Sequence, residues 1–598
     1  MDRIKVVIVD SGLREELIFK GNPDCVAVSD IENNSVIDST PASYGHGTAI
    51  YSIIRREADN AEIYNIKVKN IENGITDDDL IYVLDYIYDN IPADIINLSL
   101  GTCSRDNKRK LFESCKKLTD KGVTIVSAFD NIGMITYPAA FPNVIGVISD
   151  ERCRTVGDYI YYGSDVVNIG AKGSMQRVEW INPPKIYLSG NSLACAHVTA
   201  QVIKFYLSGI KNFSDILSEF RRISKVKCVG YEEKIPENNK IPFNINKAAV
   251  YPFNKEMHSL IRFSELLDFE IIDVYDSKYS ATVGMSTNKL MKSEECVNHT
   301  VRNISEIDWN SFDTLIIGHI QKLSGLAGLA VSKDELISEA IKNNKKIYMF
   351  DDCGFSGKAP DVFYPRVSSQ DVIHLPGGML YSVNKPVVGV FGTSSSQGKF
   401  TLQLELRKRF IASGYKIGQI GTEPQSLLFG MDCCFPVGYN STVQISGHDV
   451  ISYINYNMSK MCDLEKEIII GGGQAGVLNY GESNLQQYNV NFYDFFCGLN
   501  PDIVVFCVNP YDPVDFIKRN ITFLESVNSC KVLAAVVYPF TAYNGYLGLT
   551  SAKRKPTDEE FKTIKENLNM VLEIPIYRLD DKEDLNLLFE DIIKYFAE

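Results

Sequence analysis

Short apolar runs alternate with amphipathic stretches over roughly the first 210 residues of the chain. An apolar run of strand length that ends at polar residues predicts a buried strand, and apolar residues at helical spacing predict an amphipathic helix. Strands are predicted at residues 4–9, 61–68, 93–100, 123–127 and 144–148, and helices at 46–56, 77–90, 107–121 and from 190 to about 207. This βαβ order predicts a mostly parallel sheet with helices on both faces.

The same alternation returns twice in the rest of the chain. A helix over residues 213–225 closes the first region, and the charged, proline-containing stretch 232–241 lacks periodicity, which predicts a linker. Further strands are predicted at 248–252, 269–274, 314–318 and 346–350, and then at 387–391, 501–508 and 531–537. We therefore predict an α/β chain with a parallel-sheet domain over 1–230, a linker over 231–247, a Rossmann-like domain over 248–384 and a doubly wound domain over 385–598.

Composition narrows the class of protein. A length of 598 residues predicts several domains. The net charge of −14 argues against a nucleic-acid or anionic-membrane surface, which needs clustered basic residues. No stretch approaches the roughly 18 apolar residues of a membrane span. The chain shows no signal peptide and no C-x-x-C pair, so we expect reduced cysteines, no metal site and a cytoplasmic location.

Four short motifs place candidate catalytic residues at strand ends and helix starts. Asp10 follows the first strand in V-D-S-G, and Asn131 follows another in S-A-F-D-N. His46 lies between two glycines in G-H-G-T, and Ser192 lies in G-N-S-L-A at the start of a predicted helix. Each motif alone also fits a turn or a helix cap. In parallel sheets, however, function collects at the carboxyl ends of strands.

Taken together and in this order, the four motifs resemble those of the subtilisin-like serine peptidases (subtilases), over roughly residues 1–210. The resemblance implies that Ser192 is the nucleophile and that His46 takes its proton and later delivers it to the leaving amine. It also implies that Asp10 orients His46. Asn131 would stabilise the oxyanion together with the backbone N–H of Ser192.

The same resemblance implies a substrate-binding surface. Its residues are Ser99, Leu100 and Gly101, which resemble the edge strand that pairs with an extended substrate, and Ala128, Phe129 and Asp130. The chain departs from the family at Asn191, where Thr is usual, at Ala196, where Pro is usual, and at Phe129-Asp130, where small residues are usual. We hypothesise that Asp130 favours a basic residue before the scissile bond.

A second motif lies between the strand at 387–391 and a helix that runs to about residue 413. A strand, a Gly-rich loop and a helix form the context of a phosphate-binding P-loop, with Lys399 reaching the terminal phosphates. The spacing G-x5-G-K is longer than usual, and Phe400 replaces the usual Ser or Thr, so Thr393 or Thr401 would supply the hydroxyl on the metal side. A plain Gly/Ser turn is the alternative. The loop comprises Gly392, Thr393, Ser394, Ser395, Ser396, Gln397, Gly398, Lys399, Phe400 and Thr401.

This longer loop resembles the loops of dethiobiotin-synthetase-like P-loop proteins and of the related D-amino-acid N-acetyltransferase family. The resemblance implies ATP or GTP with Mg²⁺, or CoA, as the ligand, whereas the protease needs no cofactor. The acid that such relatives carry after a later strand is missing at Gly472, and Glu423 or Asp432 could take its place. His319 and Asp351-Asp352 follow strand ends in the Rossmann-like segment and could line a ligand crevice.

We therefore expect an intracellular serine endopeptidase with a C-terminal phosphate- or nucleotide-binding module. A subtilase joined to a Rossmann-like and P-loop pair resembles proteins of peptide-maturation systems, which implies a ribosomally made precursor peptide as substrate. Two alternatives stay open. The C-terminal half could be an ATP-dependent ligase or a CoA-dependent acyltransferase acting on the peptide, or the chain could be a nucleotide-gated regulator with an inactive protease domain. The expected partners are a peptide and a nucleotide- or CoA-type ligand, with a homo-oligomer possible, and neither nucleic acid nor a membrane is expected.

Overall fold

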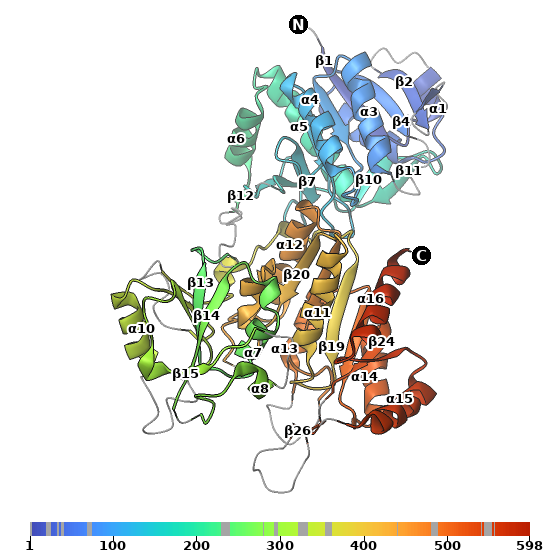
Figure 1. The fold of residues 1–598 in the computed structure, drawn as a ribbon. Coiled ribbons are helices and arrows are strands. Elements are labelled where there is room, and N and C mark those ends of the chain that lie inside the picture. Colours follow the sequence, from blue (N-terminus) through green and yellow to red (C-terminus); the bar gives the residue numbers. More distant parts are fainter. Residues whose placement is uncertain are drawn as a thin grey trace. The chain divides into compact units, whose positions relative to one another are not determined.

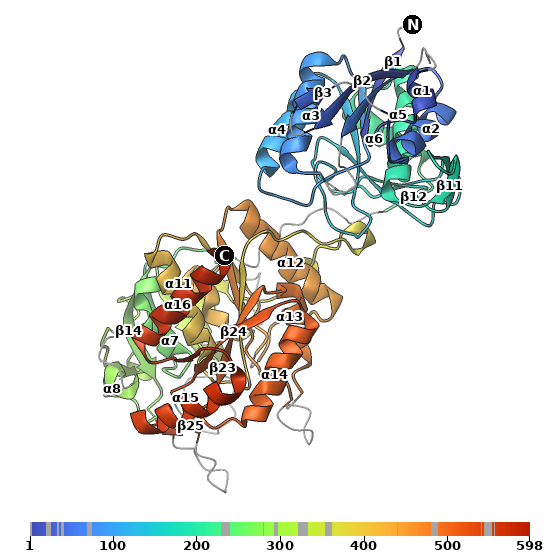
Figure 2. The same cartoon turned by 90° about the vertical axis from the view of Figure 1, so that its right-hand side faces the viewer.

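The computed structural model describes most of the chain, namely residues 3–19, 25–32, 35–37, 41–68, 75–164, 166–228, 240–278, 280–291, 297–320, 333–352, 361–438, 440–479, 488–539, 541–542, 553–554 and 556–597. The chain forms two compact units (Figures 1 and 2). Unit 1 consists of Met1–Lys234 and Ile373–Asn384, and unit 2 of Ile235–Val372 and Lys385–Glu598. Segment 373–384, which the sequence places at the end of a Rossmann-like domain, thus packs with the N-terminal unit.

Unit 1 is built on a ten-stranded sheet in the order β12-β8-β9-β7-β6-β5-β1-β4-β2-β3. Its strands pair in parallel except for β2 with β3 and β8 with β9. The strands are β1 (Ile4–Asp10), β2 (Cys25–Glu32), β3 (Ser35–Ile37), β4 (Ala61–Val68), β5 (Ile95–Leu98), β6 (Thr124–Ala128), β7 (Ile145–Ser149), β8 (Tyr159–Tyr161), β9 (Ile169–Ala171) and β12 (Val226–Lys227). The parallel sheet predicted for this region is confirmed, whereas β2 and β3 lie in a stretch where the pattern predicts no strand.

Helices cover both faces of this sheet, which explains why its central strands are largely apolar. Alternate residues of a strand point to opposite faces. Val6 and Ile8 of β1 therefore pack in one core with α2 (His46–Glu57), α5 (Asn191–Leu207) and α6 (Phe213–Ile223). The neighbouring Val7 and Val9 pack in a second core with α3 (Asp77–Asn90) and α4 (Lys108–Asp120). A hairpin of β10 (Gln176–Glu179) and β11 (Lys185–Leu188) precedes α5.

Segment 373–384 completes the second of these cores. Leu375 and Met379 belong to this core and are 9% and 5% exposed, respectively. The backbone of Leu380 joins the chain at Gly133–Ile135, because the Ile135 N–H donates to the Leu380 carbonyl at 2.9 Å and the Leu380 N–H donates to the Gly133 carbonyl at 3.3 Å. The Ser382 carbonyl accepts from the Arg105 guanidinium at 3.2 Å. The segment is therefore a structural part of unit 1.

Unit 2 contains two fully parallel sheets. The first has the order β15-β14-β13-β16-β17-β18 and the second β21-β20-β22-β19-β23-β24-β27. The first comprises β13 (Lys247–Tyr251), β14 (Glu270–Asp276), β15 (Val301–Asn303), β16 (Thr314–Ile317), β17 (Lys346–Met349) and β18 (Val362–Phe363). The second comprises β19 (Val387–Gly392), β20 (Ile417–Gly421), β21 (Cys433–Cys434), β22 (Ile468–Gly472), β23 (Ile503–Val508), β24 (Lys531–Val537) and β27 (Ile576–Arg578). The α/β fold predicted for the Rossmann-like part and for the P-loop part of this region is confirmed in both.

The two sheets of unit 2 share a hydrophobic core. Val250 of β13 and Tyr348 of β17 pack in one cluster with Leu404 of α11 (Lys399–Ala412) and with Phe429, which follows β20. The hydroxyl of Tyr348 donates to the carbonyl of Pro424 at 2.6 Å. The Rossmann-like and P-loop segments are therefore joined by burial as well as by the chain. None of the helices in the described ranges is both long and apolar enough to cross a membrane.

Candidate active site

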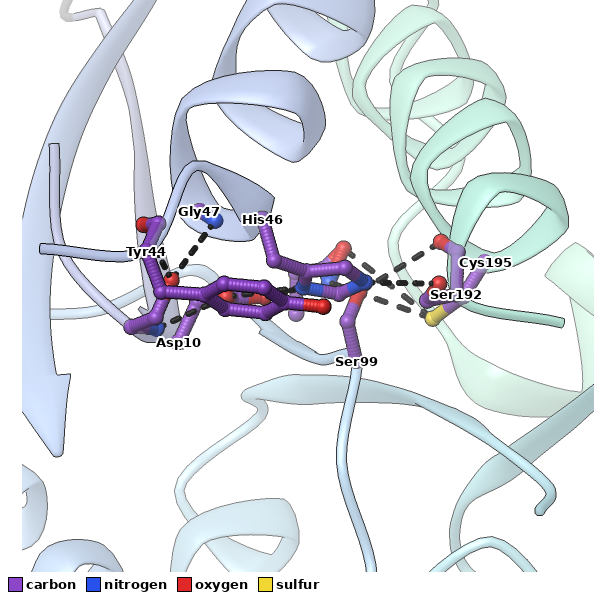
Figure 3. Close-up of polar contacts among 9 residues, drawn as sticks. Asp10, Tyr44, His46, Gly47, Ser99, Ser192 and Cys195 are labelled. Atoms are coloured by element: carbon purple, nitrogen blue, oxygen red, sulfur yellow. Dashed lines mark hydrogen bonds and ion pairs between the residues drawn. The ribbon is translucent and has the colours of Figure 1, made fainter. Parts of the chain in front are cut away.

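Asp10 and His46 meet at the carboxyl end of β1. Asp10 is the last residue of that strand and is fully buried, and His46 is the first residue of α2. The His46 Nδ1 lies 2.9 Å from Asp10 Oδ1 and 3.0 Å from Oδ2 (Figure 3). Burial lowers the pKa of His46, but the charge of Asp10 and its hydrogen bond outweigh burial, so the net shift is upward. The carboxylate thus orients the ring and favours its cation.

Ser192 lies on the other side of the same imidazole. It is the second residue of α5, is 8% exposed, and its Oγ lies 2.9 Å from His46 Nε2. The structure therefore brings the three residues of the predicted triad together in the order Asp10, His46, Ser192 (Figure 3). A serine hydroxyl, an imidazole and a carboxylate in this line form the arrangement that activates a hydroxyl for attack on a carbonyl.

The glycines on both sides of His46 allow other segments of the protein to pack closely against them. A Cβ at Gly47 would lie 2.3 Å from the carbonyl oxygen of Gly12, and a Cβ at Gly45 would lie 2.4 Å from the ring of Trp180. The Gly47 N–H donates to Ser11 Oγ at 3.0 Å, which ties the start of α2 to the end of β1. The G-H-G motif is thus required by close packing at both flanks of the histidine.

Two aromatic side chains that the sequence analysis missed lie beside the triad. The ring of Tyr44 is nearly parallel to that of His46, with centroids 6.3 Å apart and an interplanar angle of 7° (Figure 3). Trp180 meets Tyr44 edge to face at 5.2 Å. Tyr44 could have been found from its place next to the G-H-G motif. Trp180 comes from the β10–β11 hairpin and carries no local signal.

The side-chain amide of Asn131 lies beside the start of α5. Its Oδ1 accepts the backbone N–H of Asn191 at 2.8 Å, so the NH₂ end of the amide is the one that can donate to a substrate oxygen. A Cβ placed on Gly190 would lie 3.3–3.4 Å from the Asn131 amide atoms and 3.4 Å from Ser192 Oγ. The absence of a side chain at Gly190 therefore keeps space between the serine and the amide.

The expected substrate-binding residues flank this space. Ser99 follows β5, accepts from Asn97 Nδ2 at 2.9 Å and donates to the carbonyl of Ser192 at 3.4 Å. Leu100 and Gly101 continue the chain half-buried, and Thr102 then forms a two-bond bridge with Tyr137. On the other side, Ala128 ends β6 and is buried, as is Phe129, while Asp130 is half-buried.

Asp130 makes a local contact within its own loop. Its Oδ1 accepts the N–H of Ile132 at 2.5 Å, and its own N–H donates to Thr136 Oγ1 at 3.2 Å. One carboxylate oxygen is thus used to shape the turn that carries Asn131. The preference for a basic residue before the scissile bond stays a hypothesis, which cleavage of peptide libraries that vary this position would test.

The P-loop candidate lies in unit 2 between β19 and α11. Ser396 and Gly398 have positive φ angles of 60° and 74°, which produce the tight turn before the helix. Lys399 is 5% exposed, and its Nζ donates to the Ser394 carbonyl at 2.6 Å. Burial lowers the pKa of Lys399 to about 8. A buried amine whose partner is one carbonyl fits an anionic group, because a phosphate oxygen in that position would stabilise its cationic form.

Thr393 makes other contacts than those expected of a metal ligand. It is 1% exposed, its hydroxyl donates to Asp512 Oδ2, and it accepts from Gln397 Nε2. Asp512 also accepts the N–H of Asn509 at 2.8 Å. Of the two candidate hydroxyls, Thr401 is therefore the one that lies outside this network. Phe400 packs edge to face on Phe429.

Asp512 is a residue of this region that the sequence analysis missed, although its position shortly after a buried strand could have pointed to it. Of the two acids considered there, Glu423 accepts from Gln474 Nε2 at 2.7 Å, and burial raises its pKa. Asp432 accepts the N–H of Gln419 and pairs with Lys466, both at 2.9 Å.

His319 and Asp351 pair at the carboxyl ends of β16 and β17. The His319 Nδ1 lies 2.6 Å from Asp351 Oδ1, which also accepts from Asn440 Nδ2 at 3.0 Å. Burial lowers the pKa of His319. The hydrogen bond to Asp351 and the charges of nearby acids outweigh the effect of burial, so the pKa is raised overall. Asp351, Asp352, Tyr364, Arg366 and Asn440 line a cavity of about 240 Å³. Asp351 and Asp352 therefore line a cavity after β17, whereas His319 contacts Asp351 but is not among the residues that line it.

Two protein-family models match separate parts of the chain. Residues 2–208 match the model of the subtilase family, and residues 374–582 match that of a P-loop domain described as a domain of unknown function, DUF1611. No curated protein matches the chain.

Three solved structures illustrate the similarity. A DUF1611 family protein from Anabaena variabilis is 13% identical, with a TM-score of 0.44 over 59% of this chain and 100% of that one. A cold-adapted subtilisin-like serine proteinase is 22% identical, with a TM-score of 0.30 over 36% of this chain and 80% of that one. The prenylagaramide maturation protease PagA is 21% identical, with a TM-score of 0.28 over 37% of this chain and 82% of that one. From the family models, the chain carries a subtilase-family domain, which is a serine peptidase of the subtilisin type, followed by a P-loop domain of unknown function.

Proposed function

We propose that unit 1 is an active endopeptidase that cleaves a peptide through Ser192. The observation that supports this most directly is the continuous contact from Asp10 through His46 to Ser192, with distances of 2.9 Å on both sides of the imidazole. His46 would remove the Ser192 proton during attack on the peptide carbonyl and deliver it to the leaving amine. Asp10 would stabilise the imidazolium, and Asn131 with the Ser192 N–H would bind the oxyanion.

The activity is tested with a fluorophosphonate probe, which reacts only with an activated serine. We expect labelling of the wild-type protein and its loss in Ser192→Ala. Ser208→Ala is the matched control, because Ser208 is an exposed serine just after the end of the same helix whose hydroxyl donates only to Lys204. Labelling that survives in Ser192→Ala, or a wild-type protein that does not react at all, would contradict the proposal.

The finer proposal concerns the substrate. The resemblance of the protease and P-loop combination to peptide-maturation proteins supports a ribosomally made precursor peptide. Incubation of the protein with peptides encoded beside its gene, followed by mass spectrometry, gives the cleavage site directly. Cleavage at one defined bond of such a peptide supports the proposal. If the wild-type protein labels with fluorophosphonate but leaves every such peptide intact, the maturation role is refuted. The proposal that unit 1 is a protease would still stand.

We further propose that the P-loop binds a phosphate-bearing ligand, either a nucleotide or a CoA-type molecule. The buried amine of Lys399 at the start of α11 supports this. Lys399→Ala should abolish binding of ATP, GTP or acetyl-CoA in calorimetry. Lys408→Ala on the same helix should not, because Lys408 pairs with Glu265 at the surface. Binding by Lys399→Ala equal to wild type would contradict the assignment.

Peptide cleavage measured with and without the ligand separates the ligand-dependent alternatives. A protease rate that changes when ligand is added, and no longer changes in Lys399→Ala, indicates a nucleotide-gated protease. A modified peptide in the mass spectrum instead indicates the ligase or acyltransferase alternative.

A further inference from the structure

Asn191, the residue directly before the candidate nucleophile, makes more hydrogen bonds than a helix start requires. Its side-chain Nδ2 donates to the carbonyl of Phe129 at 3.1 Å and to that of Asp130 at 2.8 Å. Its Oδ1 accepts the backbone N–H of Ser149 at 2.7 Å. Both polar atoms of the side-chain amide thus bond backbone groups of two other segments.

The two segments that Asn191 joins are the ends of neighbouring strands. Phe129 and Asp130 directly follow β6, and Ser149 is the last residue of β7. The two strands are already paired, and the Phe129 N–H donates to the Val147 carbonyl at 3.1 Å. Beyond that point the chain after β6 has to turn to present Asn131, and the Asn191 side chain holds the two carbonyls at this turn.

The backbone of Asn191 acts on Asn131 directly. Its N–H donates to Asn131 Oδ1 at 2.8 Å, which fixes the orientation of that amide with the NH₂ end available. One residue therefore holds both the loop that carries Asn131 and the amide group itself. Since Asn191 precedes Ser192 in α5, the position of the oxyanion donor is coupled to that of the nucleophile.

We propose that Asn191 is a positioning residue for catalysis: its side chain holds the Phe129–Asn131 turn so that the Asn131 amide is aimed at the developing oxyanion. This inference rests on the proposed protease activity. Oxyanion stabilisation requires donors that are already in place when charge develops, because reorganising them would cost most of their effect. The shape of this amide explains the choice of residue. A threonine at position 191 offers one hydroxyl and cannot donate to two carbonyls while accepting from Ser149.

The test compares three substitutions in the full-length protein. Asn191→Ala removes all three side-chain bonds, Asn191→Thr introduces a single hydroxyl, and Asn191→Asp keeps the shape and the acceptor toward Ser149 but places an oxygen against two carbonyls. We expect kcat to fall by about 10- to 100-fold in Asn191→Ala and Asn191→Asp, less than the about 10²–10³-fold loss of an oxyanion donor itself, with little change in KM. Asn191→Thr should lie between these variants and wild type.

A double-mutant cycle with Asn131→Ala distinguishes positioning from general stability. If Asn191 acts through Asn131, Asn191→Ala should lower kcat strongly in the wild-type background and by less than about threefold when Asn131 is already alanine. Additive losses in kcat, or an Asn191→Asp variant with wild-type kcat, would overturn the proposal. Asn168→Ala is the matched control. Asn168 is buried and likewise bonds backbone groups, at Gly146 and Ser164, so its loss should lower the thermal midpoint without the kcat effect.

Failure of this inference is distinguishable from failure of the protease proposal. A wild-type protein that does not react with fluorophosphonate refutes the protease itself. A wild-type protein that reacts and cleaves peptide, together with Asn191 variants of unchanged kcat, refutes only the role of Asn191.

Discussion

Asp10 and His46 together set the pH range in which Ser192 can act. Only the neutral imidazole can accept the serine proton. The charge and hydrogen bond of Asp10 raise the pKa of His46 above its ordinary value of 6.5, against the opposite effect of burial. Activity should therefore be full above this raised pKa and should fall as the pH drops through it.

Replacing Asp10 by asparagine should change both the rate and the pH profile. The substitution removes the negative charge that raises the pKa of His46, so the acid limb of kcat/KM should move to lower pH. Loss of the orienting carboxylate in such a triad lowers kcat by about 10⁴-fold. Rates of peptide cleavage between pH 5 and 9 measure both effects. Asp59→Asn, at an exposed position after α2, is the control and should keep the wild-type profile.

At the scale of single residues, the sequence predicts which residues form the site better than it predicts the contacts between them. Asp10, His46 and Ser192 are predictable because each lies in a short motif with its own glycines. The contacts of Asn191 with Phe129, Asp130 and Ser149 are not predictable, because they join segments that are separated by more than 40 residues in the chain. The bond of Asp512 to Thr393 is unpredictable for the same reason, since it spans 119 residues.

Among the elements, the start of α2 is the one whose position matters most for the triad. Gly47 packs directly on the turn after β1, and any side chain there would meet the carbonyl of Gly12 at 2.3 Å. The position of a Cβ is set by its own backbone, and the Gly12 carbonyl is itself backbone, so neither group can rotate away. The glycine therefore fixes the distance between the helix that carries His46 and the strand that carries Asp10.

Gly47→Ala should accordingly impair catalysis through the position of the helix. Relief of the clash requires α2 to shift away from β1, and a displacement of about 1 Å in an active site can cost about 100-fold in rate. We expect a drop in kcat of this size and a lower thermal midpoint. Ser52→Ala on the same helix should leave kcat nearly unchanged, because Ser52 donates only to the Ala49 carbonyl. A Gly47→Ala enzyme with wild-type kcat would show that the contact does not position His46.

The buried strands and long helices were predictable because both faces of the sheet are covered and the apolar periodicity is strong. The strands β2 and β3 were not, since Cys25–Glu32 mixes acidic and apolar residues without a clear alternation and Ser35–Ile37 is only three residues long. The hairpin of β10 and β11 was missed as well. Its strands are four residues each and form a separate two-stranded sheet, so tertiary packing decides their conformation.

At the scale of the whole molecule, unit 1 includes a segment, Ile373–Asn384, that lies more than a hundred positions after its main part, Met1–Lys234. Leu375 and Met379 are buried in its core. Burial of such a side chain contributes about 1.5–3 kcal/mol. A chain that ends at residue 234 would leave the corresponding apolar surface of the core exposed.

A truncated chain of residues 1–234 should therefore be less stable than the same chain with residues 373–384 attached through a flexible Gly/Ser linker. For a domain of this size, each 1 kcal/mol shifts the thermal midpoint by about 2–4 °C, so a difference of about 10 °C is expected. The linked chain carrying Leu375→Ser and Met379→Ser is the control and should resemble the truncated form. Equal midpoints for the truncated and linked chains would show that the segment is not part of this core.

The pattern of polar and apolar residues predicts how many layers the chain builds but not which unit a short coil segment joins. Segment 373–384 contains no element longer than a turn of 3₁₀ helix, so periodicity gives no signal there. Its place in unit 1 is decided by the contacts of Leu375, Met379 and Leu380, and these exist only in the folded chain.

The return of segment 373–384 to unit 1 also determines what a protease could do to this protein. A single cut between β16 and β17 would divide the chain into two fragments, yet each unit would still draw residues from both of them. The halves would then be held together by two separate hydrophobic cores. Nicked protein should elute as one species under native conditions and separate only in denaturant. The gene could be divided at the same place and its two products expressed as parts that reassemble.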